Sequence, residues 1–175
     1  GWRAIIADTF TFENVRRAAQ ATAEYFKTVE NCDRAVFVGF DVRFQSEAFA
    51  RAAAEVIAAN GFRVVMLDRP YPTPYVSFEV RRRKFAGGVM ITASHNPPMF
   101  NGFKLKSYFG GSAESSTCQA IEGYLDRNPV KAVAGVGKGT RVSVKDIRPA
   151  HYAALKKLVD FKLIARSKLK FAHEA

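Results

Sequence analysis

The stretch RAVFVGFDVRFQSEAFARAAAEVIAANGFRVVML, residues 34–67, decides the fold. It begins with an apolar run over 34–40 that is rich in Val and Phe, which is typical of a buried strand. Ser46 is a suitable N-cap for a helix, and Gly61 is the stop signal of that helix. A second apolar run over 62–67 is predicted to be the next strand. The stretch therefore predicts a strand, a helix and a strand in succession.

The flanking sequence continues this alternation. Thr11 can cap a helix over about 13–29, where mostly apolar residues recur at three- and four-residue spacing. The segment 69–74 contains three prolines and is predicted to be a loop that is not helical. A short helix over 75–84 then leads to a last buried strand over 88–91. This order predicts an α/β layered domain with a largely parallel sheet.

The remainder of the chain is less regular. Residues 101–106 are predicted as a short additional strand or turn and 113–127 as a helix. Residues 128–147 carry three glycines and few helix signals, and are predicted as a hairpin-like segment or linker. Helical spacing returns over 151–160, and 168–172 resembles a strand with nothing after it. Because a parallel strand needs a following crossover to bury it, we expect this tail to begin a second domain that is cut short.

Composition indicates a soluble globular protein. Of the 175 residues, 48% are hydrophobic and 25% charged, and no apolar run approaches the ~18 residues that span a bilayer. Residues 1–12 lack the basic segment and continuous apolar core of a secretory signal. Cys32 and Cys118 are the only cysteines, so neither a disulfide framework nor a thiolate metal site is indicated. A cytoplasmic location without a membrane partner is expected.

The net charge of +11 is concentrated in two segments. Residues 81–84 carry four positive charges, and residues 145–175 carry a net charge of +5. Neither segment interleaves aromatic and basic residues as a base-stacking surface does, so nucleic-acid binding is not expected. A non-catalytic module that binds acidic partners or nucleic acid through these residues stays open as an alternative function.

Two polar segments, 41–46 and 92–96, directly follow predicted strands. In open α/β sheets ligands collect at the carboxyl ends of the strands. Ser94 is the candidate for covalent chemistry, because a hydroxyl can carry an acyl or phosphoryl group between two half-reactions. Serine is also common in turns, so a turn role stays open. A serine hydrolase is a further alternative, although the sequence has no Gly-x-Ser-x-Gly motif.

His95 and Lys104 are the next candidates. Neighbouring side chains in extended backbone point apart, so His95 is predicted to donate a hydrogen bond to an anion or substrate and not to act as a base for Ser94. A packed or surface histidine is the alternative. Lys104 follows Gly102, which permits a close backbone approach. Lys104 could therefore neutralise a phosphate or act as an acid or base.

The planar guanidinium groups of Arg3 and Arg43 suit phosphate binding. A metal site is not visible, because Asp8, Asp41 and Asp68 are scattered and form no carboxylate cluster of the kind a hard cation requires. Any Mg²⁺ would therefore need ligands from outside this chain.

The segment Thr92–Pro97, TASHNP, closely resembles the phosphoserine loop of the α-D-phosphohexomutases, the phosphoglucomutase and phosphomannomutase superfamily. Weaker matches occur in the family's order at 1–3, 38–43 with Ser46, 72–74 and 101–104. The resemblance covers residues 1–145 as the first of four family domains, and residues 146–175 resemble a linker and the start of a truncated second domain. It implies a three-layer α/β/α domain with a mainly parallel mixed sheet, plus that start of a second α/β domain.

The resemblance also implies an enzyme, an intramolecular phosphotransferase that moves a phosphoryl group between the 1- and 6-positions of a hexose. Ser94 would carry the phosphoryl group, and a hexose bisphosphate would be the intermediate. Arg3 and Lys104 would flank the phosphoserine, with Lys104 a candidate acid or base. His95 would contact the substrate or phosphate, and the expected substrate- or phosphate-binding residues are Asn96 and Arg43.

Mg²⁺ and a hexose 1,6-bisphosphate activator are the implied cofactors, and Ser94 would supply one metal ligand through its phosphate. The metal, sugar and phosphate loops of the family's later domains do not occur in this sequence. We therefore expect a fragment of a mutase that is inactive by itself, with a hexose phosphate as the substrate of the whole enzyme. Neither the particular hexose nor the oligomeric state is predicted.

Overall fold

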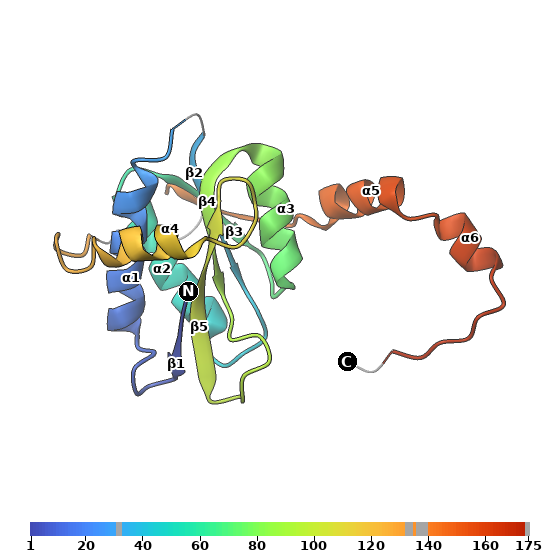
Figure 1. Ribbon diagram of the computed structural model, residues 1–175, viewed down its shortest axis with the longest axis horizontal. Coiled ribbons are helices and arrows are strands. Elements are labelled where there is room, and N and C mark those ends of the chain that lie inside the picture. Colours follow the sequence, from blue (N-terminus) through green and yellow to red (C-terminus); the bar gives the residue numbers. More distant parts are fainter. Residues whose placement is uncertain (31–32, 132–134, 136–139, 174–175) are drawn as a thin grey trace.

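The computed structural model describes residues 1–30, 33–131, 135 and 140–173. Its elements are β1 (Trp2–Ile5), α1 (Phe12–Phe26), β2 (Asp33–Phe40), α2 (Ser46–Ala59), β3 (Arg63–Leu67), α3 (Thr73–Arg83), β4 (Phe85–Ile91), β5 (Phe100–Ser107), α4 (Ser115–Glu122), β6 (Val142–Lys145), α5 (Arg148–Leu158) and α6 (Phe161–Arg166). The strands form one sheet in the order β1-β5-β4-β2-β3-β6 (Figure 1).

The sheet is mixed and mainly parallel. Strands β4, β2, β3 and β6 run parallel, whereas β5 is antiparallel to β4 and the edge strand β1 is antiparallel to β5. Every residue of β4 is buried, and β2 and β3 are buried along most of their length. Burial on both faces explains why these strands are continuous apolar runs instead of alternating patterns.

Helices cover both faces of the sheet, which confirms the predicted three-layer α/β/α class. Helices α1 and α2 pack together on one face, with α4 beside α1, and α3 lies on the other face (Figure 1). Two adjacent glycines of β4 allow this close packing. A Cβ on Gly87 would lie 2.4 Å from Phe26 Cζ of α1, and one on Gly88 would lie 2.8 Å from Val80 Cγ2 of α3. The missing side chains let a helix approach β4 from each side.

The first two helices begin differently. Thr11 caps α1 as predicted, since its side chain accepts a hydrogen bond from the Asn14 amide at 3.2 Å. The prediction that Ser46 caps α2 was wrong. Gln45 is the N-cap, with a left-handed φ of 59° and no side-chain cap bond, and Ser46 is the first helical residue. The Ser46 hydroxyl instead donates to Asp41 Oδ1 at 2.9 Å.

The prediction at the start of α3 needs correction, whereas the strand alternative predicted for β5 is confirmed. Helix α3 begins at Thr73, inside the segment predicted to be non-helical, because Pro74 lies in the first turn, where its missing N–H costs no hydrogen bond. Residues 100–107 form a strand, which is the first of the two alternatives predicted for 101–106 and is longer than expected. Strand β1 was not predicted at all; it is held by antiparallel pairing with β5, a contact between distant segments.

The later elements also differ from expectation. Helix α4 is shorter than the predicted 113–127. Within the predicted hairpin or linker, Val142–Lys145 pairs with β3 as a parallel edge strand, and residues 132–134 and 136–139 lie outside the described residues. The predicted strand over 168–172 is absent, and that segment has no regular secondary structure.

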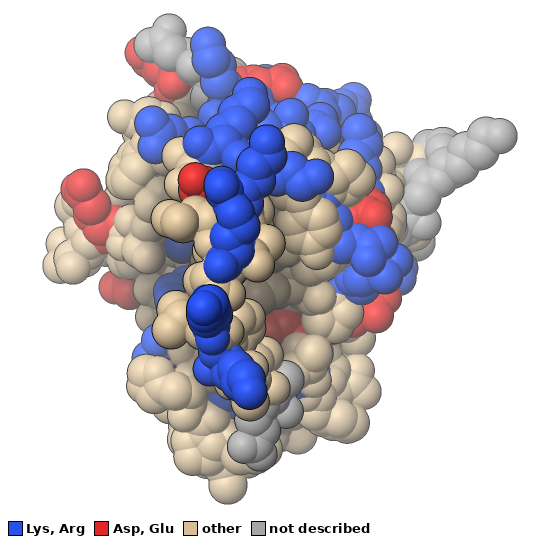
Figure 2. Space-filling model, turned by 90° about the vertical axis from the view of Figure 1, so that its right-hand side faces the viewer, with Lys and Arg blue, Asp and Glu red and all other residues tan. Residues whose placement is uncertain are grey.

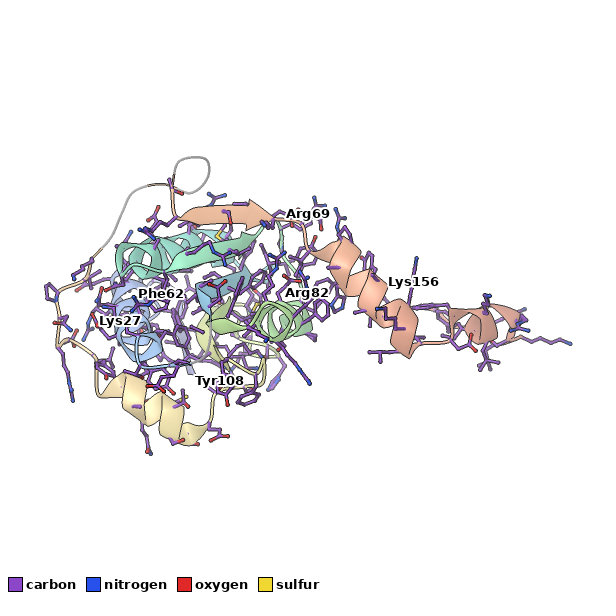
Figure 3. All side chains as sticks on the ribbon, turned by 90° about the horizontal axis from the view of Figure 1, so that it is seen from above. Lys27, Phe62, Arg69, Arg82, Tyr108 and Lys156 are labelled. Atoms are coloured by element: carbon purple, nitrogen blue, oxygen red, sulfur yellow. The ribbon has the colours of Figure 1, made fainter. Side chains whose placement is uncertain are left out.

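Helices α5 and α6 extend away from the sheet domain (Figure 1). The contact that docks α5 is aromatic: the His151 ring stacks on Tyr75 with centroids 3.9 Å apart and meets Phe78 edge-on at 5.1 Å. In Figure 3, Arg69 and Arg82 lie on the side of the domain from which α5 leaves, and Lys156 projects outward from α5. None of the helices in the described ranges has both the length and the apolar character needed to cross a membrane.

Candidate phosphoserine site

Ser94 lies in the loop that follows β4 at the carboxyl end of the sheet. Its φ is +54°, a left-handed conformation that costs a non-glycine residue roughly 1–2 kcal/mol. Local hydrogen bonds support this conformation: the Ser94 amide donates to Thr92 Oγ1 at 3.0 Å, and the Asn96 amide donates to the Ala93 carbonyl at 3.0 Å. Thr92 and Ala93 are buried, whereas Ser94 is exposed. The loop thus presents Ser94 at the surface on a fixed turn.

Arg3 and Lys104 reach the same region from β1 and β5. Arg3 is paired in register with Gly102, and the Gly102 carbonyl accepts a hydrogen bond from the Thr92 amide at 2.9 Å. A Cβ on Gly102 would lie 2.6 Å from the Thr92 oxygen and 3.0 Å from Arg3 Cγ, so only glycine allows this approach. Arg3, Thr92 and Lys104 line one hollow of about 280 Å³. The structure therefore brings two cationic side chains together at the start of the Ser94 loop.

Arg43 has partners different from those expected of a phosphate ligand. Its side chain is 13% exposed, and both terminal nitrogens donate to backbone carbonyls of the Ser94 loop. Its Nε lies 3.6 Å from Asp41 Oδ2. In this arrangement the guanidinium group binds the loop backbone.

His95 and Asn96 occupy the turn beside Ser94. His95 is exposed and has no hydrogen-bond or ring partner within the described ranges. The Asn96 carbonyl accepts from Arg43 at 2.6 Å, and its side-chain Oδ1 is buried without a hydrogen-bond partner among the described residues. The His95 ring is therefore free to meet a ligand, and the Asn96 side chain retains an unused acceptor.

Several supporting residues were not recognised as such from the sequence. Thr92 supplies the hydroxyl that holds the Ser94 amide, and Asp41, Ser46 and Asn101 form a chain of hydrogen bonds behind Arg43. All of them lie inside the segments that carry the family resemblance, 38–43 with Ser46, 92–97 and 101–104. Membership of these segments was the signal available in the sequence. Their partners could not be assigned because each bond joins segments that are distant in sequence or depends on an unusual turn.

A second lysine lies on β5 beside the site. Lys106 is 6% exposed, and burial, followed by the positive charge of Lys104, lowers its pKa below the ordinary lysine value.

Within the described ranges, no three His, Cys, Asp or Glu residues converge as a metal site would require.

Basic side chains gather on the face that carries the C-terminal helices (Figure 2). Part of this charge is neutralised within the chain. Arg82 and Arg83 pair with the fully buried carboxylate of Glu79 at 2.8 and 2.7 Å, and Arg148 pairs with Asp146 at 2.8 Å. These arginines have carboxylate partners within α3 and at the start of α5, which does not favour the alternative of a basic binding module.

The family model of the phosphoglucomutase/phosphomannomutase α/β/α domain I matches residues 1–131. The fold and the Ser94 loop agree with this match, and the chain belongs to the phosphoglucomutase/phosphomannomutase family. The part of the family to which it corresponds is the first domain.

The proteins that this chain resembles are named for different sugars. The chain is 36% identical over 126 residues to a phosphoglucomutase of Staphylococcus saprophyticus, covering 71% of this chain and 22% of the relative. It is 41% identical over 110 residues to a phosphoribomutase of Saccharomyces cerevisiae, covering 61% of this chain and 17% of the relative. A crystal structure described as a "putative phosphomannomutase" from Thermus thermophilus superposes with a TM-score of 0.85 at 39% identity, covering 94% of this chain and 36% of that one. The chain thus spans about a fifth of the length of these two curated relatives.

Proposed function

We propose that this chain is the phosphoserine-bearing first domain of a phosphosugar mutase, an intramolecular phosphotransferase. The observation that carries the proposal is the position of Ser94, held in a left-handed turn after β4 and two residues beyond Thr92, which lines a hollow together with Arg3 and Lys104. Phosphoryl transfer depends mainly on positioning and charge neutralisation, and these residues can provide both. The activity belongs to the whole enzyme, of which residues 1–145 would be domain I and 146–175 a linker and the start of domain II.

In the proposed reaction, the bond between phosphorus and Ser94 Oγ breaks while a phosphorus–oxygen bond forms at the free hydroxyl of a sugar monophosphate. The hydroxyl proton passes to a base, for which Lys104 is the candidate. The resulting bisphosphate then returns its other phosphate to Ser94 Oγ, and the sugar oxygen takes back a proton. Arg3 would stabilise the negative charge of the moving phosphoryl group, and His95 and Asn96 would contact the phosphate or sugar.

Mg²⁺ and a hexose 1,6-bisphosphate activator belong to this proposal. The described residues fit Mg²⁺ only in part, because a phosphate on Ser94 would supply one oxygen ligand and no carboxylate cluster lies beside it. The remaining ligands would come from other parts of the enzyme, and no step is assigned to the metal.

The substrate class is a sugar phosphate, and a hexose phosphate is our first candidate. A pentose phosphate is the second, since a relative 41% identical to this chain is named phosphoribomutase. The cytoplasmic location expected from the sequence stays a prediction.

The test uses the complete gene product that contains this chain. Mass spectrometry of the peptide with Ser94 should detect a phosphoryl group after incubation with glucose 1,6-bisphosphate, and comparison with ribose 1,5-bisphosphate distinguishes the two sugar classes. Ser94→Ala should lower mutase activity at least about 1,000-fold, because it removes the group that carries the phosphoryl. Ser116→Ala, at an exposed position of α4, is the control. Unchanged turnover in Ser94→Ala would overturn the proposal.

A further inference from the structure

Four backbone carbonyls of the Ser94 loop converge on one guanidinium group. Arg43 Nη2 donates to the carbonyls of Ser94 and Asn96 at 2.8 and 2.6 Å. Arg43 Nη1 donates to those of Pro97 and Phe100 at 2.9 and 3.0 Å. Three of these carbonyls, those of Ser94, Asn96 and Pro97, lie between the end of β4 at Ile91 and the start of β5 at Phe100, where no neighbouring strand of the described residues pairs with them.

Both terminal nitrogens of the guanidinium group are fully engaged by the loop. The group offers five N–H donors in a rigid planar fork, four of which bind the loop carbonyls, while the fifth, on Nε, faces Asp41 Oδ2 at 3.6 Å. A phosphate could recruit Arg43 only if these contacts broke.

Arg43 is itself held from behind. Its amide donates to Asp41 Oδ1 at 3.0 Å, and the same oxygen accepts from the Ser46 hydroxyl at 2.9 Å. Ser46 Oγ in turn accepts from Asn101 Nδ2 at 2.9 Å, and both Ser46 and Asn101 are fully buried. A chain of hydrogen bonds that starts at the buried Asn101 of β5 therefore holds the backbone of Arg43 in place behind its guanidinium group.

We propose that Arg43 is a positioning residue that holds Ser94 in its left-handed turn, and not a phosphate ligand. Its contact with the Ser94 carbonyl, together with the bond from the Ser94 amide to Thr92, fixes both peptide groups of the residue. The consequence for phosphoryl transfer rests on the proposed function of Ser94, whereas the effect on the loop does not. Displacing a reacting atom by about 1 Å can slow a reaction by about 100-fold, so the loop geometry should control the rate.

Lysine cannot replace Arg43 in this role. An ammonium group is a compact charge with three donors at one point and cannot span carbonyls on residues 94 to 100. Arg51 provides a matched control: it follows in α2, its side chain is 46% exposed, and it pairs with Glu47 at 2.7 Å without contacting the loop.

The experiment compares Arg43→Lys, Arg43→Ala and the control Arg51→Lys in the complete gene product. Amide hydrogen exchange over residues 94–100 measures the loop, and exchange over β2 and β4 reports whether each variant is folded. Phosphoryl transfer to Ser94 from glucose 1,6-bisphosphate measures the chemistry. Arg43→Lys should speed loop exchange at least about 10-fold and slow phosphoryl transfer about 100-fold, with β2 and β4 unchanged. Guanidinium ion added to Arg43→Ala should restore both loop protection and transfer.

Three outcomes separate the possibilities. If Arg43→Lys matches Arg51→Lys in loop exchange, the positioning role is wrong. If guanidinium restores transfer without restoring loop protection, Arg43 acts on the phosphate and the proposal is likewise overturned. If the unmodified protein takes up no phosphoryl group, the proposed function fails, while loop exchange still decides the role of Arg43.

Discussion

Asn101 donates a hydrogen bond from Nδ2 to Ser46 Oγ across 2.9 Å, which ties β5 to the first turn of α2. Both residues are fully buried, so water cannot replace the bond. The Ser46 hydroxyl passes the connection to Asp41, which holds Arg43. The buried Ser46 hydroxyl therefore connects β5 to Asp41 and Arg43, the residues that support the Ser94 loop.

Replacing this hydroxyl should destabilise the domain. Ser46→Ala would leave the buried Asn101 Nδ2 with only its longer bond to the Phe44 carbonyl at 3.4 Å and would remove one of the two donors to Asp41 Oδ1. We expect a loss of about 1–3 kcal/mol in the free energy of unfolding. Urea denaturation measures the effect. The exposed Ser116→Ala control should stay within about 0.5 kcal/mol of the unmodified protein. Equal stability of the two variants would show that the buried chain of hydrogen bonds contributes little.

Gly87 should not tolerate a methyl group. Its Cβ would lie 2.4 Å from Phe26 Cζ and 2.7 Å from the Lys106 carbonyl oxygen, and the backbone oxygen cannot turn away. Gly87→Ala is expected to cost about 1–3 kcal/mol in thermal or urea unfolding, as overpacked cores do. Gly123→Ala is the control, because Gly123 has ordinary helical dihedrals of −63° and −16°. A Gly87→Ala protein as stable as this control would mean that α1 can shift freely on the sheet.

Lys106 should make stability rise with pH in the alkaline range. Burial, together with the charge of Lys104, lowers its pKa in the folded state below the reference value of 10.5. Between the two pKa values the unfolded chain binds more protons, so the free energy of unfolding increases with pH across that interval. Below the folded pKa, Lys106 is charged in both the folded and the unfolded state. The free-energy cost of burying its ammonium group is then present in full.

Removing the ammonium group should abolish this dependence. Lys106→Met is expected to be more stable than the unmodified protein at pH 7 by about 1 kcal/mol, since the ammonium group of Lys106 has no hydrogen-bond or ion-pair partner in the described part of the chain. The advantage should shrink as the pH approaches 10.5. Lys156→Met on α5, where the lysine is exposed, serves as the control in unfolding curves measured from pH 7 to 10.5. A constant difference at all pH values would contradict the role of the charge.

Asp146 should keep its charge to low pH. Hydrogen bonds from the Arg148 side chain, and then from its backbone amide, lower the pKa of Asp146 to about 2 from 3.8. Because the folded pKa is the lower one, the stabilisation is complete above the unfolded value and is lost as the pH falls through the folded one. The carboxyl carbon shift of Asp146 in NMR titrations should have a midpoint near 2.

Substitution at Arg148 checks the cause. Arg148→Lys removes the paired guanidinium contacts, which lie at 3.0, 3.1 and 2.8 Å, and the midpoint of Asp146 should rise toward 3.8. An unchanged midpoint would assign the lowered pKa to the backbone hydrogen bond alone.

The central elements could be predicted from the sequence because their signals are local. The buried runs of β2, β3 and β4 and the cap at Thr11 each depend on a few adjacent residues, and the structure has them close to the expected positions. Ser94 was likewise expected at the carboxyl end of β4, since a polar segment directly follows the apolar run. The start of α3 was wrong because a proline in the first turn and a proline in a loop look alike in sequence.

The edges of the sheet and the partners of the site residues depended on the tertiary structure. Strands β1 and β6 have only four residues each and are held by pairing with β5 and β3, so their own sequences carry little signal. The planar fork of Arg43 could suit a phosphate or several carbonyls equally well. Only the folded chain, which brings residues 51 to 57 positions apart into contact, assigns its donors to the Ser94 loop.

The sequence by itself therefore determined the order of the central strands and helices and the place of Ser94, because hydrophobic periodicity, caps and turns act over short ranges. The tertiary structure alone decided that Arg3 and Lys104 share a hollow and that Arg43 binds the loop carbonyls. These relationships depend on which distant segments pack together, and that packing is set by the burial of the whole core and not by any one segment.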